Sequence, residues 1–196
     1  MNMTKTLIVR EAGLPNSGEI WTIGHSVRSI EEFLALLHEN DIYSIVDVRS
    51  FPGSRRHPQF GRETMSAWLA DDAITYQQAS DLGGRRNRDY NVDPAINAGW
   101  RLASFRNYAD YTLGDAYQAG IVQLGIEAKN SRVAFMCSEV LPWRCHRSLI
   151  ANTFVAGDWA VHHIMSLGKV IEHHLGAWGP EPLVIDHQVI YPEAGN

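Results

Sequence analysis

Four short segments of the sequence combine nucleophilic, acid–base and cationic side chains in a pattern that is typical of an active site. Cys137 is closely followed by Glu139, and a Cys–His–Arg run begins at Cys145. A thiolate close to arginine or to a helix N-terminus is stabilised and can act as a nucleophile. A histidine exchanges a proton near neutral pH and can act as an acid or a base. The predicted catalytic residues are Cys137, His25, Asp47 and Glu139.

The arginines of the chain are clustered. The chain has 17 lysines and arginines against 22 acidic residues, and nine of its arginines lie in segments 49–62, 82–88 and 140–150, which contain no acid. Arginine binds phosphate or carboxylate through two hydrogen bonds and keeps its charge. Arginine clusters in an acidic chain indicate a focused anion site, not a broadly basic nucleic-acid surface. The predicted ligand-binding residues are Ser26, Arg49, Arg55, Arg56, Arg85, Arg86, His146 and Arg147.

Each of these residues also has a structural interpretation. Cys137 is either a reactive thiol or a small buried apolar residue. Cys145 shares a predicted helix face with Leu149, which favours a place in the core and makes Cys137 the more reactive thiol. Asp47 either orients an arginine or acts as a base, and Glu139 has the same two alternatives.

The two cysteines are too widely spaced for a compact zinc site. We therefore predict no metal and no cofactor, although a mixed site of Cys137, Cys145, His25 and His146 stays open as an alternative. The histidine pairs at 162–163 and 173–174 are predicted to be ordinary strand residues.

The candidate residues follow segments with the patterns of buried strands. Strands are predicted over 19–23, 42–48, 74–77 and 132–136, and a hairpin over 159–165 and 169–174. Helices are predicted after a capping box at Ser29 and Glu32, and over 62–70, 104–129 with a possible break at Gly114, and 142–156. The last twenty residues are predicted to be irregular.

Strands that alternate with helices predict an α/β fold: one three-layer domain with a mostly parallel central sheet, helices on both faces and a C-terminal hairpin. The domain is expected to span 19–196, after a flexible tail over 1–18. Ligands bind beyond the carboxyl ends of such strands. Gly24–Ser26, Asp47–Arg49, Gly83–Arg86 and Cys137–Glu139 are all expected at that edge.

The composition predicts a cytoplasmic protein without a membrane span. No apolar run is long enough to cross a bilayer, and the first ten residues do not resemble a signal peptide. Two cysteines do not make a disulfide framework.

The motifs also resemble a known family. Its signature segments are Thr22–Ser26, Asp47–Arg49 with Pro52 and Ser54–Arg56, Leu82–Gly84, Cys137–Glu139 and Cys145–Arg147. In this order they resemble domain-of-unknown-function family 488, over about residues 21–174. The resemblance implies a single α/β domain with its signature residues gathered at one site, and it implies no particular activity.

The residues favour an enzyme, a hydrolase or a transferase, that acts on a phosphate-containing ligand such as a nucleotide or a nucleic-acid end. Sulfur or phosphoryl chemistry in the style of a rhodanese is a variant of this hypothesis. The alternative is a non-catalytic nucleotide or nucleic-acid binding module that stacks bases on aromatic side chains. A third hypothesis is a structural protein whose polar motifs form a buried network.

Overall fold

The computed structural model describes residues 13–53 and 56–193. Its elements, in chain order, are β1 (Gly18–Gly24), α1 (Ile30–Glu39), β2 (Ser44–Asp47), η1 (Pro58–Phe60), α2 (Arg62–Asp71), β3 (Thr75–Gln78), η2 (Ser80–Leu82), α3 (Ala103–Thr112), α4 (Asp115–Asn130), β4 (Val133–Cys137), η3 (Pro142–Arg144), α5 (Arg147–Ala156), β5 (Trp159–Ser166), β6 (Lys169–Glu172), β7 (Leu183–Ile185) and β8 (Gln188–Ile190). The short η elements are 3₁₀ helices.

The predicted α/β architecture is confirmed. Six strands form one sheet in the order β3-β2-β4-β1-β5-β6, in which only β6 runs antiparallel to its neighbour. From β1 the chain crosses over through α1 to β2, toward the β3 edge of the sheet. From β4 it crosses over through α5 to β5, toward the β6 edge. The adjacent strands β1 and β4 therefore flank a topological switch point, where open α/β sheets bind their ligands.

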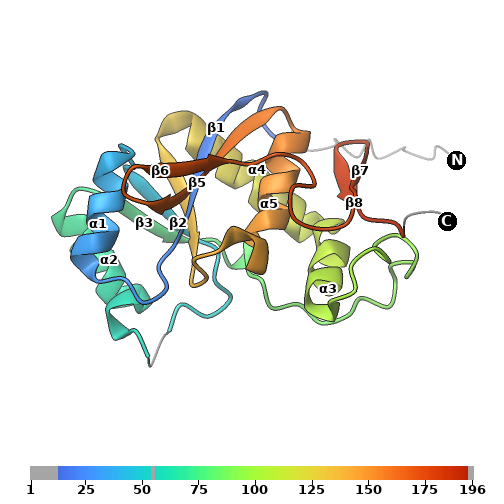
Figure 1. Ribbon diagram of the computed structural model, residues 1–196, viewed down its shortest axis with the longest axis horizontal. Coiled ribbons are helices and arrows are strands. Elements are labelled where there is room, and N and C mark those ends of the chain that lie inside the picture. The colour runs from blue at the N-terminus through green and yellow to red at the C-terminus, as the bar shows by residue number, and fades with distance from the viewer. Residues whose placement is uncertain (1–12, 54–55, 194–196) are drawn as a thin grey trace, which may run out of the picture.

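The two faces of the sheet carry separate cores, which explains the three layers (Figure 1). One apolar cluster joins the sheet to α1 and α2, and the other joins it to α3, α4 and α5. Successive strand residues point to opposite faces. In β4, Ala134 and Met136 pack toward α1 and α2, whereas Phe135 and Cys137 pack toward α5.

Several local predictions are confirmed. The Ser29 side chain and the Glu32 side chain form the expected reciprocal capping box at the start of α1. The helical segment that was expected over 104–129 is divided at Gly114 into α3 and α4. The expected hairpin consists of β5 and β6.

Two local predictions are wrong. The expected helix over 142–156 is a 3₁₀ turn at Pro142–Arg144 followed by α5, which begins only at Arg147. The C-terminal segment contains a second hairpin, β7 and β8, where irregular chain was expected.

Of the expected tail, residues 1–12 lie outside the described residues, and β1 already begins at Gly18. The division into tail and domain stays a prediction.

Within the described chain, no helix has both the length and the apolar character that a membrane crossing requires.

Candidate active site

The loops that follow three parallel strands meet at the carboxyl edge of the sheet. After β1, the His25 amide donates to the Cys137 carbonyl at 3.0 Å, and the Ser26 amide donates to the Ser138 carbonyl at 2.9 Å. After β2, the Val48 amide donates to the Met136 carbonyl at 2.9 Å. These main-chain bonds bring the segments together, as the switch-point rule predicts.

Gly24 permits the closest of these approaches. A Cβ at this position would overlap the main-chain carbonyl of Glu139. Two residues later, Ser26 adopts a left-handed backbone conformation with φ 46°, which is uncommon for a non-glycine residue. The loop after β1 can therefore lie against the loop after β4 only without a side chain at Gly24.

We expect Gly24→Ala to destabilise the protein by about 3 kcal/mol. The added Cβ would clash with backbone, and neither loop can shift without breaking its main-chain hydrogen bonds to the other loop. Gly53→Ala is the matched control, since a Cβ at Gly53 would have no atom of the described residues within 4 Å. Urea unfolding of both variants measures the difference. Equal midpoints would show that the two loops separate easily.

A pocket of about 840 Å³ opens at this edge. Of the residues predicted from the sequence, it is lined by His25, Ser26, Arg49, Arg56, Arg85, Cys137, Glu139 and His146. Asp47, Arg86 and Arg147 are not among its lining residues, and Arg55 lies outside the described residues. The pocket is also lined by Arg144, which was not predicted as a site residue, and by Cys145, which the sequence had placed only in the alternative metal site.

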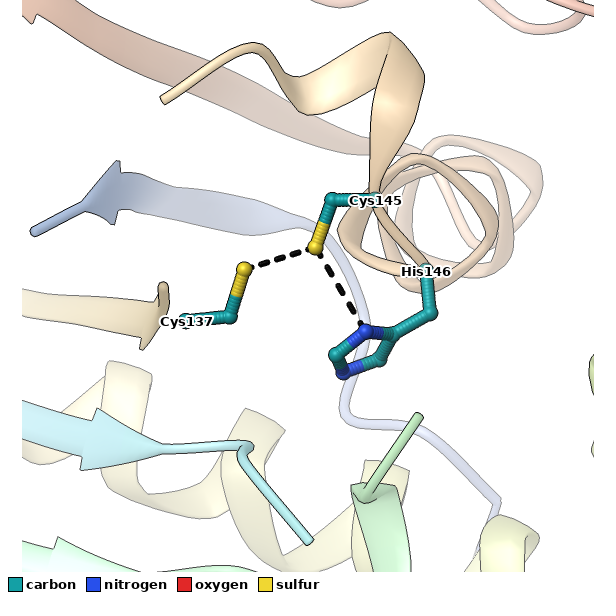
Figure 2. A group of neighbouring side chains, drawn as sticks. All are labelled: Cys137, Cys145 and His146. Atoms are coloured by element: carbon teal, nitrogen blue, oxygen red, sulfur yellow. Dashed lines mark hydrogen bonds between the residues drawn. The ribbon is translucent and has the colours of Figure 1, made fainter. Parts of the chain in front are cut away.

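The two cysteines, which both line this pocket, form a pair with their side chains pointing toward one another (Figure 2). Their sulfur atoms lie 2.6 Å apart, both residues are buried, and both are free thiols. The sequence had indicated that Cys145 lies on a helix face with Leu149, but Cys145 is not part of a helix. It precedes α5 in an extended conformation, with φ −132° and ψ 148°, which directs it toward Cys137.

The Arg147 side chain is buried next to the cysteine pair. It is 1% exposed, its Nε donates to Cys137 Sγ at 3.1 Å, and its Nη2 donates to the Glu139 and Val140 carbonyls. The ion pairs between described residues are His38–Asp72, Arg49–Asp47 and His162–Glu19, so no carboxylate neutralises Arg147. A buried cation is costly without a counter-charge. The cysteine pair is the group in contact with Arg147 that can supply this charge.

The pair loses its first proton easily and its second one reluctantly. Burial alone raises the pKa of the Cys145 thiol, but the hydrogen bond with Cys137 and the Arg147 guanidinium outweigh it and lower this pKa to about 6. Burial and the hydrogen bond with Cys145 raise the pKa of Cys137 well above its usual value. The two thiols therefore share one negative charge near neutral pH.

His146 completes the cluster with a defined tautomer. Its Nε2 donates to the Val48 carbonyl at 2.9 Å, which leaves Nδ1 as an acceptor 3.4 Å from Cys145 Sγ. Burial lowers the pKa of His146 and keeps the ring neutral. The Val48 carbonyl thus fixes the orientation of the imidazole, with its acceptor nitrogen next to Cys145 Sγ.

Gly83 and Gly84 shape this corner of the pocket. A Cβ on Gly84 would overlap the His146 ring, and one on Gly83 would overlap Ser50. Both glycines are therefore accounted for by close packing between loops.

Asp47 and Arg49 form a buried ion pair. The Arg49 Nε donates to Asp47 at 2.8 Å and its Nη2 at 2.5 Å, and the Tyr76 hydroxyl donates to the same carboxylate at 2.7 Å. The carboxylate is fully buried. Of its two sequence interpretations, this geometry favours the one in which Asp47 orients an arginine.

His25 is held on both sides. Its Nδ1 donates to the Ser26 carbonyl at 3.0 Å, and its Nε2 accepts from Arg49 Nη1 at 3.1 Å. The ring stacks on Phe60 with the centroids 4.3 Å apart. Burial, and then the Arg49 charge, lower the pKa of His25 to about 4. At neutral pH the His25 ring is therefore an uncharged part of the pocket lining.

The remaining arginines divide into two groups. Arg56, Arg85 and Arg144 are exposed and line the pocket. Arg86 points elsewhere: its guanidinium donates to the Ser80, Asp81 and Gly83 carbonyls and stacks on Tyr111 at 3.6 Å.

Cys137, Cys145 and His146 also offer donor atoms for a metal ion. Their ligand atoms all lie within 4.8 Å of one another. Two thiolates and an imidazole suit zinc or another soft cation, and the Val48 carbonyl would orient the imidazole as a second-shell partner does. The buried Arg147 cation opposes a second cation at the same place. That the protein uses no metal stays a prediction.

The comparisons with known proteins agree with the motifs. The family described as Domain of unknown function DUF488 matches residues 29–154, which is more than half of the chain. Neither the curated proteins nor the solved structures contain a match. The signature segments from Asp47 to Arg147 lie within the matched region, whereas Thr22–Ser26 precedes it, and the chain belongs to the DUF488 family.

Proposed function

We propose that the protein is a cysteine-dependent hydrolase or transferase that acts on a phosphate-bearing ligand, such as a nucleotide or a nucleic-acid end. One observation carries the proposal: the Arg147 guanidinium is buried without a carboxylate partner and donates to Cys137 Sγ. A protein maintains such an arrangement at a cost in stability, and a resident thiolate explains it.

The chemistry that this thiolate supports is nucleophilic substitution at phosphorus. The Cys145 sulfur forms a bond to phosphorus while the bond from phosphorus to the leaving oxygen breaks, and the leaving alkoxide takes a proton from water. A second water then cleaves the S–P bond, which releases phosphate and restores the thiol pair. A transferase would use another hydroxyl in place of this second water.

The charges around the pocket favour an anionic ligand. Arg56, Arg85 and Arg144 line it and are exposed, whereas Glu139 is the acidic residue of the lining. Arg49 is already paired with Asp47. Exposed guanidinium groups at the pocket attract phosphate and other anions.

Alkylation of the two thiols tests the proposal. Native protein is treated with iodoacetamide near neutral pH, with and without inorganic phosphate or a nucleoside monophosphate at constant ionic strength. We expect Cys145 to be labelled at least about tenfold faster than Cys137, because its pKa is about 6, and phosphate to slow this labelling. Peptide mass spectrometry measures both rates.

Two variants and a chelator sharpen this test. Arg85→Ala should weaken the protection by phosphate, and Arg88→Ala, a change to a neighbouring arginine outside the pocket lining, should leave it unchanged. Labelling that accelerates only after chelation would assign the cluster to a metal. A matching screen follows phosphate release from phosphoesters with the wild type and Cys145→Ser, and protection without any turnover would contradict the enzymatic part of the proposal.

One observation favours the alternative, a non-catalytic binding module. Phe51 is 70% exposed at the pocket and lies 5.7 Å from the Arg85 guanidinium, so together they offer an aromatic face and a cation to a base and its phosphate. Trp21 and Phe60, by contrast, are buried in the core.

A further inference from the structure

A chain of buried polar side chains leads from the thiol pair along the α5 face of the sheet to Asn152 on α5. Arg147 Nη1 donates to Thr22 Oγ1 at 2.9 Å, and Thr22 Oγ1 lies 2.9 Å from His163 Nδ1. His163 Nε2 lies 3.0 Å from His173 Nδ1, and His173 Nε2 lies 2.9 Å from Asn152 Oδ1. All five residues are buried.

The direction of each hydrogen bond follows from the two ends of the chain, because Arg147 can only donate and Asn152 Oδ1, which also accepts from the Gly176 amide, can only accept. Arginine can only donate, so Thr22 accepts from Arg147 and its single hydroxyl proton goes to His163 Nδ1. His163 then carries its proton on Nε2 and donates to His173. His173 in turn donates from its own Nε2 to the Asn152 carbonyl oxygen. Every link is satisfied in only one sense, which is a property of ordered polar networks.

The sheet register places these groups. Thr22 in β1 and His163 in β5 are paired residues on neighbouring parallel strands, and both side chains point to the α5 face. Asn152 lies on α5 and His173 directly follows β6. Trp178 packs on both imidazoles, with ring centroids 5.1 Å from His163 and 5.2 Å from His173.

Both imidazoles are kept neutral. Burial, and then the neighbouring His173, lower the pKa of His163 to about 2, and burial, followed by His174, lowers the pKa of His173 to about 4. Neutral acceptors suit the position, because a charged imidazole would repel Arg147. The proposed function makes no use of either histidine.

We propose that Thr22, His163, His173 and Asn152 form a positioning relay, which holds the Arg147 guanidinium so that its Nε points at the thiol pair. The inference rests on the proposed function in one respect, the presence of the thiolate. Arg147 acts on the sulfur atoms directly, whereas the four relay residues act through Arg147 and touch neither thiol.

Titration of the thiolate tests the relay without any substrate. The ultraviolet absorbance of the thiolate and the rate of alkylation are followed between about pH 5 and 9 for the wild type, Thr22→Val and His163→Leu. Besides Arg147, the titratable groups that face the pair are His146 and Tyr108, and both variants leave them unchanged.

We expect both variants to raise the apparent thiol pKa by about one unit, which lowers alkylation near pH 6.5 by about threefold, because Arg147 loses its fixed orientation. Thr22→Ser keeps the hydroxyl and should restore the wild-type titration. His162→Leu is the matched control, since His162 lies on the same strand but packs on Trp21 at the opposite face of the sheet.

The outcomes separate the two proposals. A wild-type thiolate step that neither Thr22→Val nor His163→Leu shifts would overturn the relay and leave the proposed function standing. A wild type without a thiolate step in this range would overturn both. If His163→Leu does not fold, Thr22→Val against Thr22→Ser decides alone, because this pair of variants differs at a single buried hydroxyl.

Discussion

Arg147→Met is expected to remove the thiolate from the pocket. Methionine is unbranched and fills much of the buried space, but it has neither the charge nor the Nε donor that faces Cys137 Sγ at 3.1 Å. Without the cation, only the hydrogen bond with Cys137 still opposes burial, and the pKa of Cys145 rises from about 6 toward its ordinary value. The thiolate fraction near neutral pH then falls by up to about thirtyfold.

The rate of iodoacetamide labelling near neutral pH measures this loss, and a matched variant separates charge from geometry. Arg147→Lys keeps a cation, but a single ammonium group cannot reach Cys137, Thr22 and the Glu139 carbonyl together. Its thiol pKa should lie between those of the wild type and Arg147→Met. A folded Arg147→Met protein that still labels at the wild-type rate would show that the arginine is not the counter-charge of the thiolate.

The position of the site could be predicted from the sequence because it depends on strand order alone. His25 and Cys137 each follow an apolar strand, and parallel strands end at one edge of their sheet. The structure brings these two segments together through the bond from the His25 amide to the Cys137 carbonyl. This part of the prediction needed no knowledge of side-chain contacts.

The role of Cys145 could not be predicted because it depends on where a helix begins. Pro142 is favoured in a first helical turn, and the apolar spacing after it continues into α5. The chain instead forms a 3₁₀ turn and is extended at Cys145 before α5 begins at Arg147. The helix begins five residues later than predicted, and Cys145 is therefore buried beside Cys137 at the pocket rather than on a helix face.

The histidine relay was hidden for a different reason. Strand alternation correctly implied that one histidine of each pair points inward, and His163 and His173 are the inward members. Their partners Thr22 and Asn152 come from elements that are distant in sequence, and only the sheet register unites them. A polar residue in an otherwise apolar strand such as β1 was the available signal.

Acid is expected to unfold the protein in a window set by its buried histidines. His25, His163 and His173 have pKa values of about 4, 2 and 4 in the folded protein, mainly because burial disfavours their charged forms. In the unfolded chain each binds a proton near pH 6.5. Folding stability is therefore fully present above pH 6.5 and falls as the pH drops toward 4, because the unfolded state binds more protons.

The expected loss is large. At pH 5 each of the three histidines has cost the folded state about 2 kcal/mol, on the order of 6 kcal/mol together, which is comparable to the whole stability of many domains. Cys145 affects the folding stability at higher pH. Its pKa of about 6 in the folded protein is depressed, so its contribution to the free energy of unfolding is lost as the pH falls from about 9 to 6. The two effects can thus be separated along the pH axis.

Urea midpoints at about pH 7, 6 and 5 measure the slope, and two neighbouring variants identify its source. His173→Asn removes one buried imidazole and should reduce the loss between pH 6.5 and 5 by about a third. His174→Asn changes the adjacent exposed histidine, which is only the second cause of the low His173 pKa after burial, and should keep nearly the wild-type slope. If both variants lose stability with the wild-type slope, the acid sensitivity comes from other groups, and the neutral buried imidazole that the relay requires at His173 would not exist.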